Sequence, residues 1–177
     1  MITDKPKVSI IIVNFNGERF LEKCFSSIRR NKGVSYEIIF VDNASKDKSV
    51  EFVTKNYPNT KIIQNKSNLG FAGGNNIGVR KAKGEYFLLL NNDTIIESDF
   101  LKKTLRAFEE IPNLGCLQPK IVLMKDNNVL DSCGSYLTDT SFLYHYGYDK
   151  EQSLAKYNIS IPIFSVKGVA ILTKRQI

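Results

Sequence analysis

The amino-acid sequence predicts an α/β protein, a three-layer αβα sandwich with a mostly parallel, Rossmann-like central sheet and a mixed second half. Two observations predict this class. Nearly continuous apolar runs of strand length recur through the first half, and such runs are typical of strands buried on both faces of a parallel sheet. Between them lie segments with the apolar stripe of an amphipathic helix. Repeated strand–helix units of this kind form doubly wound sheets.

The first half contains four such units. The expected strands are residues 8–13, 36–41, 60–64 and 86–90. We expect the first, second and fourth of them to be adjacent, central and parallel, because their apolar character is continuous and helices lie between them. Helical stripes fall within residues 20–28, 50–57 and 100–108. The segment 68–78 is rich in glycine and asparagine, and a third helix is expected only at its end, at residues 77–82.

Individual residues indicate where two of the helices begin and end. Ser45 is expected to cap the second helix, with Asp47 in its first turn, and Pro58 stops that helix. Ser98 is expected to cap the fourth helix, which ends near Pro112.

The pattern changes after about residue 113. Strand-like segments separated by polar turns replace the strand–helix units, and they predict a mixed or antiparallel edge with long loops. These segments are residues 121–124, 129–131, 142–146 and 166–173.

Composition narrows the class of protein. A chain of 177 residues suits one domain. The 25 Lys and Arg residues against 18 Asp and Glu residues give a net charge of +7. This charge suits a partner such as a nucleotide diphosphate, a nucleic acid or an anionic membrane surface, or it reflects only a solvated surface.

Cys24, Cys116 and Cys133 form no CxxC pair and are expected to be reduced thiols of a cytoplasmic protein. Residues 1–7 do not resemble a secretory signal, and no apolar run approaches the roughly 18–20 residues of a membrane helix.

Polar residues follow three of the expected strands. They are Asn14-Phe15-Asn16, Asp42-Asn43 and Asn91-Asn92-Asp93. A single Asp after a strand is often only a helix cap. Three polar clusters at the carboxyl edge of one sheet instead predict a ligand-binding crevice, because open α/β sheets bind ligands at that edge.

The residue types in this crevice suit a nucleotide sugar. The ring of Phe15 can stack on a base, and the carboxylate of Asp42 can accept hydrogen bonds from a base N–H or a ribose hydroxyl. A diphosphate needs Mg²⁺ or Mn²⁺, which is typically held by one or two carboxylates together with phosphate oxygens and waters. Asp93 can supply that carboxylate. The metal also stabilises the departing nucleotide diphosphate as a Lewis acid.

Four segments, VSIIIVNFNG, FVDNAS, SNLGFAGGNN and GEYFLLLNNDT, occur in this order. They resemble the serial motifs of the inverting family 2 glycosyltransferases, which have the GT-A fold, and most closely the bacterial rhamnosyltransferase-like branch. The resemblance is strong over residues 7–99 and weak beyond. It implies metal-assisted transfer of a sugar from a nucleotide-diphosphate donor to a glycan or lipid-linked acceptor in cell-envelope polysaccharide synthesis. It also implies a cytoplasmic location, with association at the inner face of the membrane and self-association left open.

The resemblance assigns roles by position. Phe15 would line the base pocket, Asp42 would bind the base or ribose, and Asn92 would face the ribose. Asp93 would be the metal ligand, because Asn91-Asn92-Asp93 stands where the family has its DxD-type motif, although the two earlier acidic positions are Asn here. Asn76 matches a family Asn at the start of the third helix, where it would contact the ligand or only cap the helix.

The resemblance also divides the chain. We treat residues 1–177 as one domain, with a nucleotide-sugar-binding half (1–112) and the start of an acceptor half (113–177). The family continues past a strand like 166–173 into an acceptor-site segment that carries the catalytic Asp or Glu base. The base is therefore expected beyond Ile177, and the chain is expected to be a fragment that leaves apolar surface uncovered. The alternative is a non-catalytic nucleotide-sugar-binding module.

Other classes find less support. The glycines do not form the G-x-G-x-x-G pattern of a dinucleotide-binding oxidoreductase, and a Walker loop and a G-x-S-x-G elbow are absent. His145 has no nearby Cys or His partner in the sequence and is expected to be an ordinary loop or strand residue. Asp131 and Asp139 have no context that marks them as bases. Nucleic-acid binding rests on the positive charge alone and is not expected.

Overall fold

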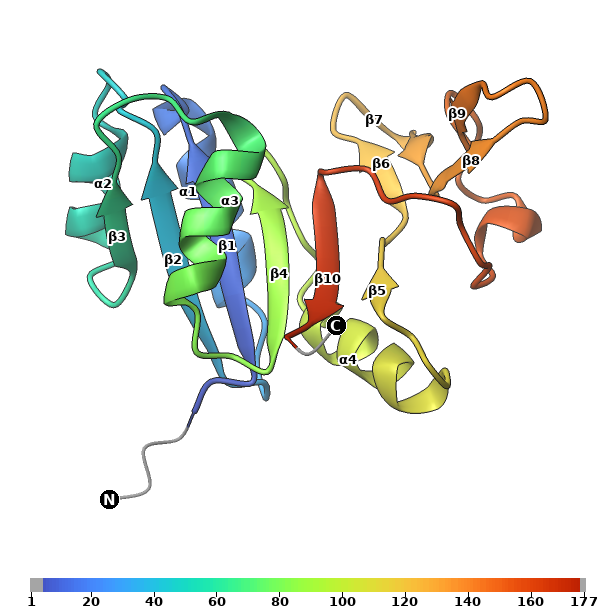
Figure 1. Cartoon of the computed structure of the whole chain (residues 1–177), viewed down its shortest axis with the longest axis horizontal. Coiled ribbons are helices and arrows are strands. Elements are labelled where there is room, and N and C mark those ends of the chain that lie inside the picture. Colours follow the sequence, from blue (N-terminus) through green and yellow to red (C-terminus); the bar gives the residue numbers. More distant parts are fainter. Residues whose placement is uncertain (1–4, 176–177) are drawn as a thin grey trace.

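The structure, a computed structural model, describes residues 5–175, so the first four residues of the N-terminal segment and the last two of the chain lie outside the described part. A six-stranded sheet forms the centre, in the order β3-β2-β1-β4-β10-β5 (Figure 1). Its strands are β1 (Val8–Asn14), β2 (Tyr36–Asp42), β3 (Lys61–Gln64), β4 (Tyr86–Asn91), β5 (Cys116–Leu117) and β10 (Ala170–Lys174).

The sheet is parallel on one side and mixed on the other. β1 pairs in parallel with β2 and with β4, and β2 pairs in parallel with β3. β10 runs antiparallel to its neighbours β4 and β5. The prediction that the first, second and fourth strands are adjacent, central and parallel is therefore confirmed.

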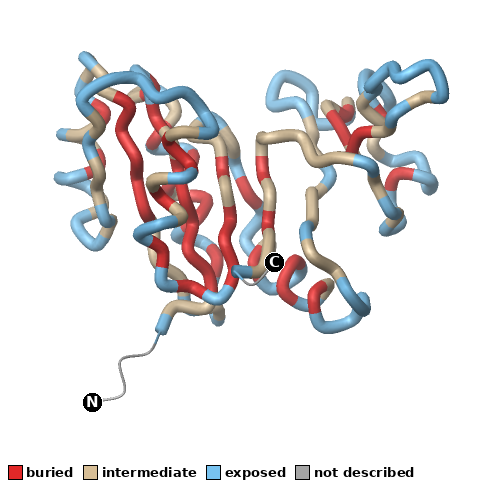
Figure 2. Tube along the Cα trace, in the orientation of Figure 1, coloured by how far each residue is buried: buried red, intermediate tan, exposed pale blue. Residues whose placement is uncertain are grey.

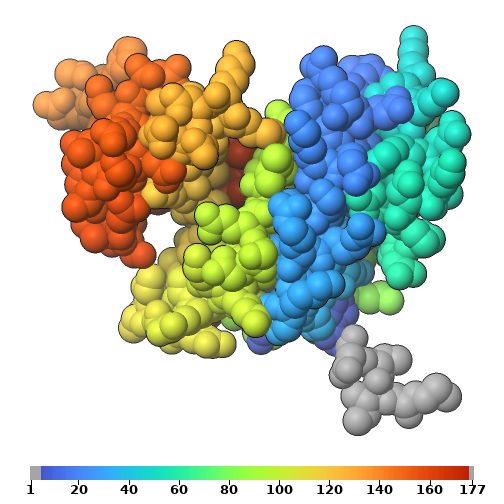
Figure 3. All heavy atoms as spheres, turned by 180° about the vertical axis from the view of Figure 1, so that it is seen from behind, coloured from blue at the N-terminus to red at the C-terminus, as the bar shows by residue number. Residues whose placement is uncertain are grey.

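Helices cover both faces of this sheet. α1 (Glu18–Arg29), α2 (Ser49–Asn56) and α4 (Phe100–Glu110) pack on one face, and α3 (Gly70–Lys81) packs on the other (Figure 1). The space-filling view from behind shows the second half of the chain as a bulge beside the first half (Figure 3). The three-layer αβα sandwich predicted from the sequence is the observed fold.

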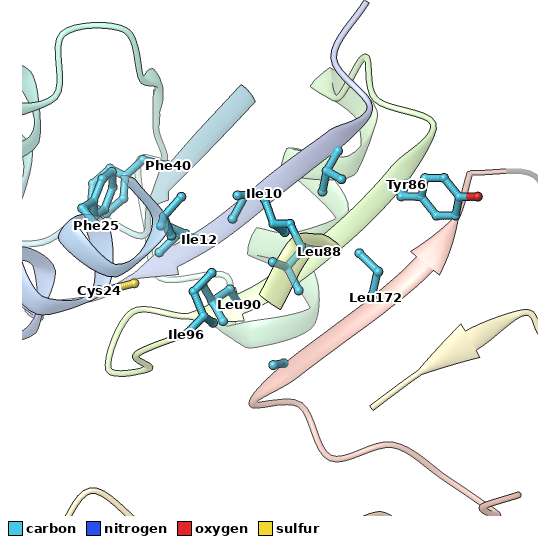
Figure 4. Close-up of a cluster of buried hydrophobic side chains, with 14 of the residues drawn as sticks. Ile10, Ile12, Cys24, Phe25, Phe40, Tyr86, Leu88, Leu90, Ile96 and Leu172 are labelled. Atoms are coloured by element: carbon cyan, nitrogen blue, oxygen red, sulfur yellow. The ribbon is translucent and has the colours of Figure 1, made fainter. Parts of the chain in front are cut away.

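The central strands are buried on both faces (Figure 2). Ile10 and Ile12 face α1, where the core includes Phe25 from that helix and Leu88 from β4 (Figure 4). Ile11, between them, belongs to the core on the α3 side. Side chains of a strand alternate between the two faces, so a strand covered by helices on both faces needs an uninterrupted apolar run.

α3 begins at Gly70 and is longer than the helix predicted at residues 77–82. Close packing explains the difference. A Cβ atom at Gly78 would lie 2.4 Å from Ile11 Cγ2, and one at Gly74 would lie 2.6 Å from Val13 Cγ1. These glycines let the helix backbone approach β1, and that packing outweighs the low helix propensity of glycine, roughly 1 kcal/mol relative to alanine.

Both predicted N-caps are wrong. α2 begins only at Ser49, and the hydroxyl of Ser45 donates to Asp42 instead of to the helix. α4 begins after Asp99, so Ser98 does not occupy its cap position. In the first case the loop after β2 makes its hydrogen bonds to the strand end before the helix starts, which local sequence cannot reveal.

The second half consists of short antiparallel pairs and long loops. β6 pairs with β7, and β8 pairs with β9. These elements are β6 (Ile121–Leu123), β7 (Asp126–Ser132), β8 (Ser135–Leu137), β9 (Leu143–His145) and a 3-10 helix (Ala155–Tyr157). The predicted mixed or antiparallel edge is confirmed for β10, which joins the central sheet, whereas β6 to β9 form two separate two-stranded sheets. β5 and β8 were not predicted, because strands of two or three residues are too short to show alternation.

Two further expectations concern the whole chain. The thiols of Cys24, Cys116 and Cys133 are free, as expected. In the described residues, no helix is both long enough and apolar enough to cross a membrane.

Candidate functional site

Parallel pairing places three strand ends side by side. Asn14, the last residue of β1, is in register with Asp42, the last residue of β2. On the other side of β1, Val13 is in register with Asn91, the last residue of β4. The polar clusters predicted at the carboxyl edge of the sheet therefore meet there, at the edge where open α/β sheets bind ligands.

Asn14 joins these strand ends through a buried side-chain amide, which is only 1% exposed. Its Nδ2 donates to Asp42 Oδ1 at 3.1 Å and to Ser45 Oγ at 3.0 Å. Its Oδ1 accepts a hydrogen bond from Asn92 Nδ2 at 2.6 Å. One side chain thus connects Asp42 and Asn92, two of the predicted nucleotide-sugar-binding residues. We call these three residues together with Ser45 the strand-end network.

Asp42 is buried, and its carboxylate accepts three hydrogen bonds from the protein. In addition to the Asn14 amide, the hydroxyl of Ser45 donates to Oδ1 at 2.6 Å and the backbone N–H of Ser45 donates to Oδ2 at 2.9 Å. A carboxylate has about four acceptor positions. Oδ2 therefore keeps the capacity to accept one more hydrogen bond, of the kind that a base N–H or a ribose hydroxyl donates.

Phe15 follows Asn14, and this residue is 49% exposed. The next residue, Asn16, has a φ of 50°, which asparagine tolerates better than most residues. Asn16 N–H donates to Ser45 Oγ at 2.9 Å, and Asn16 Oδ1 accepts from Lys46 N–H at 2.7 Å. These bonds attach the loop after β1 to the loop after β2, and they leave the Phe15 ring exposed for stacking on a planar ligand.

Asp93 is exposed and lies on the α1 side of the site. It lines a cavity of about 300 Å³ with Arg19, Phe20, Lys23, Cys24, Ile95 and Met124. Two cationic side chains and one carboxylate thus face the same opening. This combination suits an anionic ligand that is bound together with a divalent cation.

Cys24 lines the same cavity but is buried. Burial raises the pKa of its thiol to about 12, and the negative charge of Asp93 acts in the same direction. The thiol donates to the backbone carbonyl of Asn91, with Sγ and O 3.8 Å apart. Because only the thiolate is a good nucleophile or metal ligand, Cys24 at neutral pH is a core residue.

The side chains near Asp93 can be compared with the ligands that Mg²⁺ or Mn²⁺ needs. No three His, Cys, Asp or Glu side chains within residues 5–175 form a metal-binding cluster. Asp93 alone therefore does not make a closed metal cage. A single exposed carboxylate does fit Mg²⁺ or Mn²⁺ that arrives with a nucleotide, because such ions take most of their ligands from phosphate oxygens and waters.

Asn76 lies apart from the strand-end network. It is inside α3, beyond the first turn, with an exposed side chain, and α3 covers the face of the sheet opposite α1. The alternative that Asn76 caps the third helix is wrong, because that helix begins at Gly70. Its contact with a ligand stays a prediction.

The sequence placed Asn14 in the predicted crevice without a function of its own, did not single out Gly17, and assigned Ser45 to a helix cap. A Cβ atom at Gly17 would lie 2.1 Å from Asn92 Nδ2 and 2.5 Å from Asn14 Oδ1, so this glycine makes room for their hydrogen bond. The sequence does show a polar residue, Asn14, at the end of an apolar strand. Its hydrogen-bond partners can be identified only from the register of the strands.

The remaining candidates lie in the second half. Lys167 Nζ donates to Asp131 Oδ2 at 2.6 Å in a largely buried ion pair. Nδ1 of His145 lies 2.7 Å from Ser135 Oγ and links β9 to β8, which agrees with the expected structural role. Asp139 is exposed between these two strands.

Solved structures that are similar to this chain include glycosyltransferases with the GT-A fold. S. aureus TarS 1–349 matches with a TM-score of 0.64 and 21% identity, covering 88% of this chain and 50% of that one. A mannosyltransferase from Pyrobaculum calidifontis matches with a TM-score of 0.64 and 16% identity, covering 98% of this chain and 46% of that one. At these identities the likeness defines the fold class.

The family follows from sequence. A profile described as glycosyl transferase family 2 matches residues 9–169, and the chain belongs to this family. An uncharacterized glycosyltransferase of Haemophilus influenzae is 30% identical over 108 residues, 61% of this chain and 36% of that protein. One from Rickettsia typhi is 26% identical over 162 residues, 92% of this chain and 46% of that protein. The chain thus spans less than half the length of these relatives.

Proposed function

We propose that this protein is a glycosyltransferase that transfers a sugar from a nucleotide-diphosphate donor to a glycan or lipid-linked acceptor with inversion. The observation that carries the proposal is the strand-end network, in which Asn14 links Asp42 to Asn92. It lies at the carboxyl edge of the sheet, where nucleotides bind in open α/β folds. Membership of glycosyl transferase family 2 supports the same activity.

The proposed donor lies across this network. The Phe15 ring stacks on the base, and Asp42 Oδ2 accepts a hydrogen bond from the base or ribose. Asn92 faces the ribose, and Asn76 remains a candidate contact on the α3 side. Related structures support this class of donor, since TarS is described in complex with UDP-GlcNAc and the P. calidifontis mannosyltransferase with GDP-Man and Mn²⁺.

Asp93 is the proposed ligand of Mg²⁺ or Mn²⁺. The cation, when bound, offsets the charge of the diphosphate and stabilises it as a leaving group. Arg19 and Lys23 line the cavity beside Asp93 and add positive charge there. Their positive charge helps to offset the charge of the diphosphate at a site where Asp93 is the single carboxylate, because Asn occupies the two positions before it.

The acceptor is proposed to be a glycan or a lipid-linked sugar. The names of two relatives support a polysaccharide product, because they are a chondroitin synthase and a hyaluronan synthase of Pasteurella multocida, each 30% identical over 114 residues. The net charge of +7 suits work beside an anionic membrane surface.

Donor binding is tested by calorimetry with a panel of UDP-, GDP- and dTDP-sugars, each with Mn²⁺, with Mg²⁺ and with a chelator. We expect one nucleotide to bind with a metal-dependent affinity. Free sugars and nucleic acid serve as negative controls. Absence of binding across the whole panel would overturn the proposal.

Catalysis requires a base within about 2.6–3.2 Å of the acceptor hydroxyl, directly or through one water. Asp42 and Asp93 already have other proposed roles, so we propose that the base is not among residues 1–177. Transfer by this chain is then expected to be poor although donor binds. The second candidate function, a nucleotide-sugar-binding module for this part of the protein, predicts the same outcome. Multiple turnovers in a transferase assay with donor and an acceptor panel would show that the base lies within the chain.

A further inference from the structure

One buried amide spans the proposed donor site. Asn14 contacts Asp42 at one end and Asn92 at the other, and Asp93 follows Asn92 directly. The nucleoside end of the site and the metal end are therefore held together by this side chain. Both N–H groups of the Asn14 amide are donated within the protein, to Asp42 and Ser45, so Asn14 acts on a ligand through its partners.

Asp42 and Asn92 require opposite ends of the Asn14 amide. The carboxylate of Asp42 is an acceptor, so Nδ2 of Asn14 faces it. The Nδ2 group of Asn92 is a donor, so Oδ1 of Asn14 faces it. Aspartate has the same shape as asparagine, but it presents only acceptors when it is ionised. An isosteric substitution therefore reverses one of the two contacts.

Gly17 is a second, independent indication that the hydrogen bond between Asn14 and Asn92 is a specific feature of the site. Its φ of −111° and ψ of 17° suit other residues, so backbone conformation does not require a glycine there. The available space does require a glycine, because an added Cβ atom would lie 2.1 Å from Asn92 Nδ2 and 2.5 Å from Asn14 Oδ1. A position where a side chain would block this hydrogen bond is thus occupied by glycine.

We propose that Asn14 is a positioning residue that sets Asn92, and with it Asp93, at a fixed distance from Asp42, so that base and diphosphate of one donor are bound together. This inference rests on the proposed function. It predicts that breaking the contact with Asn92 weakens binding of the diphosphate part more than binding of the nucleoside part.

The first test is Asn14→Asp, with donor affinity measured by calorimetry from pH 5 to pH 8. Among the described residues, the titratable side chain in hydrogen-bond contact with Asn14 is Asp42. At low pH the new carboxyl can keep a proton and donate it to Asp42, which restores the bond. At high pH two adjacent carboxylates repel each other. The ratio of variant to wild-type Kd is expected to rise about tenfold or more between these pH values.

The matched control is Asn59→Asp, which makes the same chemical change at an exposed position in the loop before β3. Its Kd ratio to wild type is expected to stay near one at every pH. Melting temperatures of all variants are recorded without ligand, so that a general loss of folded protein is recognised. A purely structural role for Asn14 would lower the melting temperature without the pH-dependent change in Kd.

The second test is Gly17→Ala, whose Cβ atom would lie between Asn92 Nδ2 and Asn14 Oδ1 and push them apart, while no side chain of the strand-end network is replaced. The nucleoside diphosphate that binds best with Mn²⁺ is expected to lose about tenfold or more in affinity, and the matching nucleoside monophosphate about threefold or less.

The outcomes separate this inference from the proposed function. If wild type binds no nucleotide of the panel, the proposed function and the inference fail together. If wild type binds but the Asn14→Asp ratio does not change with pH, or Gly17→Ala weakens both nucleotides equally, Asn14 is not a positioning residue and the proposed function stands.

Discussion

Glu18 and Asp47 cap each other's helices. Asp47 Oδ2 accepts a hydrogen bond from the backbone N–H of Glu18 at the start of α1, at 3.0 Å. Glu18 Oε2 accepts from the backbone N–H of Lys48 just before α2, at 3.1 Å, and Asp47 Oδ1 accepts from that of Ser49, also at 3.1 Å. These N–H groups have no partner within their helices. The pair therefore ties together the helices that follow the loops of the proposed site.

Asp47→Ala is expected to destabilise the protein by about 1–2 kcal/mol at pH 7, because both helix starts lose an acceptor. Burial acts to raise the pKa of Asp47, but hydrogen bonds from Ser49 and from the Glu18 backbone N–H lower it below its ordinary value. A lowered pKa stabilises the folded state above the unfolded pKa of about 3.9, and this contribution disappears as pH falls through the folded pKa. Denaturant unfolding at pH 7 and pH 3 measures the difference. A gap between wild type and variant that stays constant down to pH 3 would contradict the assignment, and exposed Asp139→Ala is the control.

Gly78→Ala is expected to destabilise the protein by about 1–3 kcal/mol, although alanine is the better helix former. The added Cβ atom would lie 2.4 Å from Ile11 Cγ2 and would push α3 away from β1. Thermal unfolding measures the effect. Arg80→Ala, at an exposed position of the same helix, is expected to change stability by less than about 0.5 kcal/mol. A stabilised Gly78→Ala variant would show that the helix does not pack this closely.

Asp42→Ala is expected to weaken donor binding by about 1.5–3 kcal/mol, because a charge-assisted hydrogen bond to the base or ribose is lost. The same carboxylate holds Asn14 and Ser45, so the melting temperature is measured with the affinity. Binding is compared at a temperature where the variant is fully folded. Unchanged affinity of the folded variant would remove Asp42 from the donor site.

Asp93→Ala is expected to abolish the metal dependence of donor binding. Asp93 is exposed and lines the cavity beside α1, so its removal is not expected to unfold the protein. Calorimetry with and without Mn²⁺ tests this, and Glu97→Ala supplies a control at a nearby exposed carboxylate. If Mn²⁺ still strengthens binding to the Asp93→Ala protein, the metal is held elsewhere.

The sequence by itself determined the class of fold and the edge of the sheet at which the polar residues gather. The reason is local. An apolar run such as Ile10–Ile12, followed by polar residues and an amphipathic stripe, admits few structures other than a buried parallel strand that leads into a helix. Asp42 and Asn92 could be placed at the carboxyl edge because each directly follows such a run or ends it.

Tertiary structure alone decided which of these residues touch and where the less regular elements begin. The bond from Asn14 to Asn92 joins residues 78 positions apart, and it depends on the register of β1 with β4. Gly74 lies in the glycine-rich segment that was not expected to be helical, yet it serves close packing of α3 on Val13. Serine is a common helix cap, yet the hydroxyl of Ser45 donates to Asp42 at the neighbouring strand end instead of capping the helix. Each of these outcomes is set by atoms brought together from distant parts of the chain, which composition and periodicity do not record.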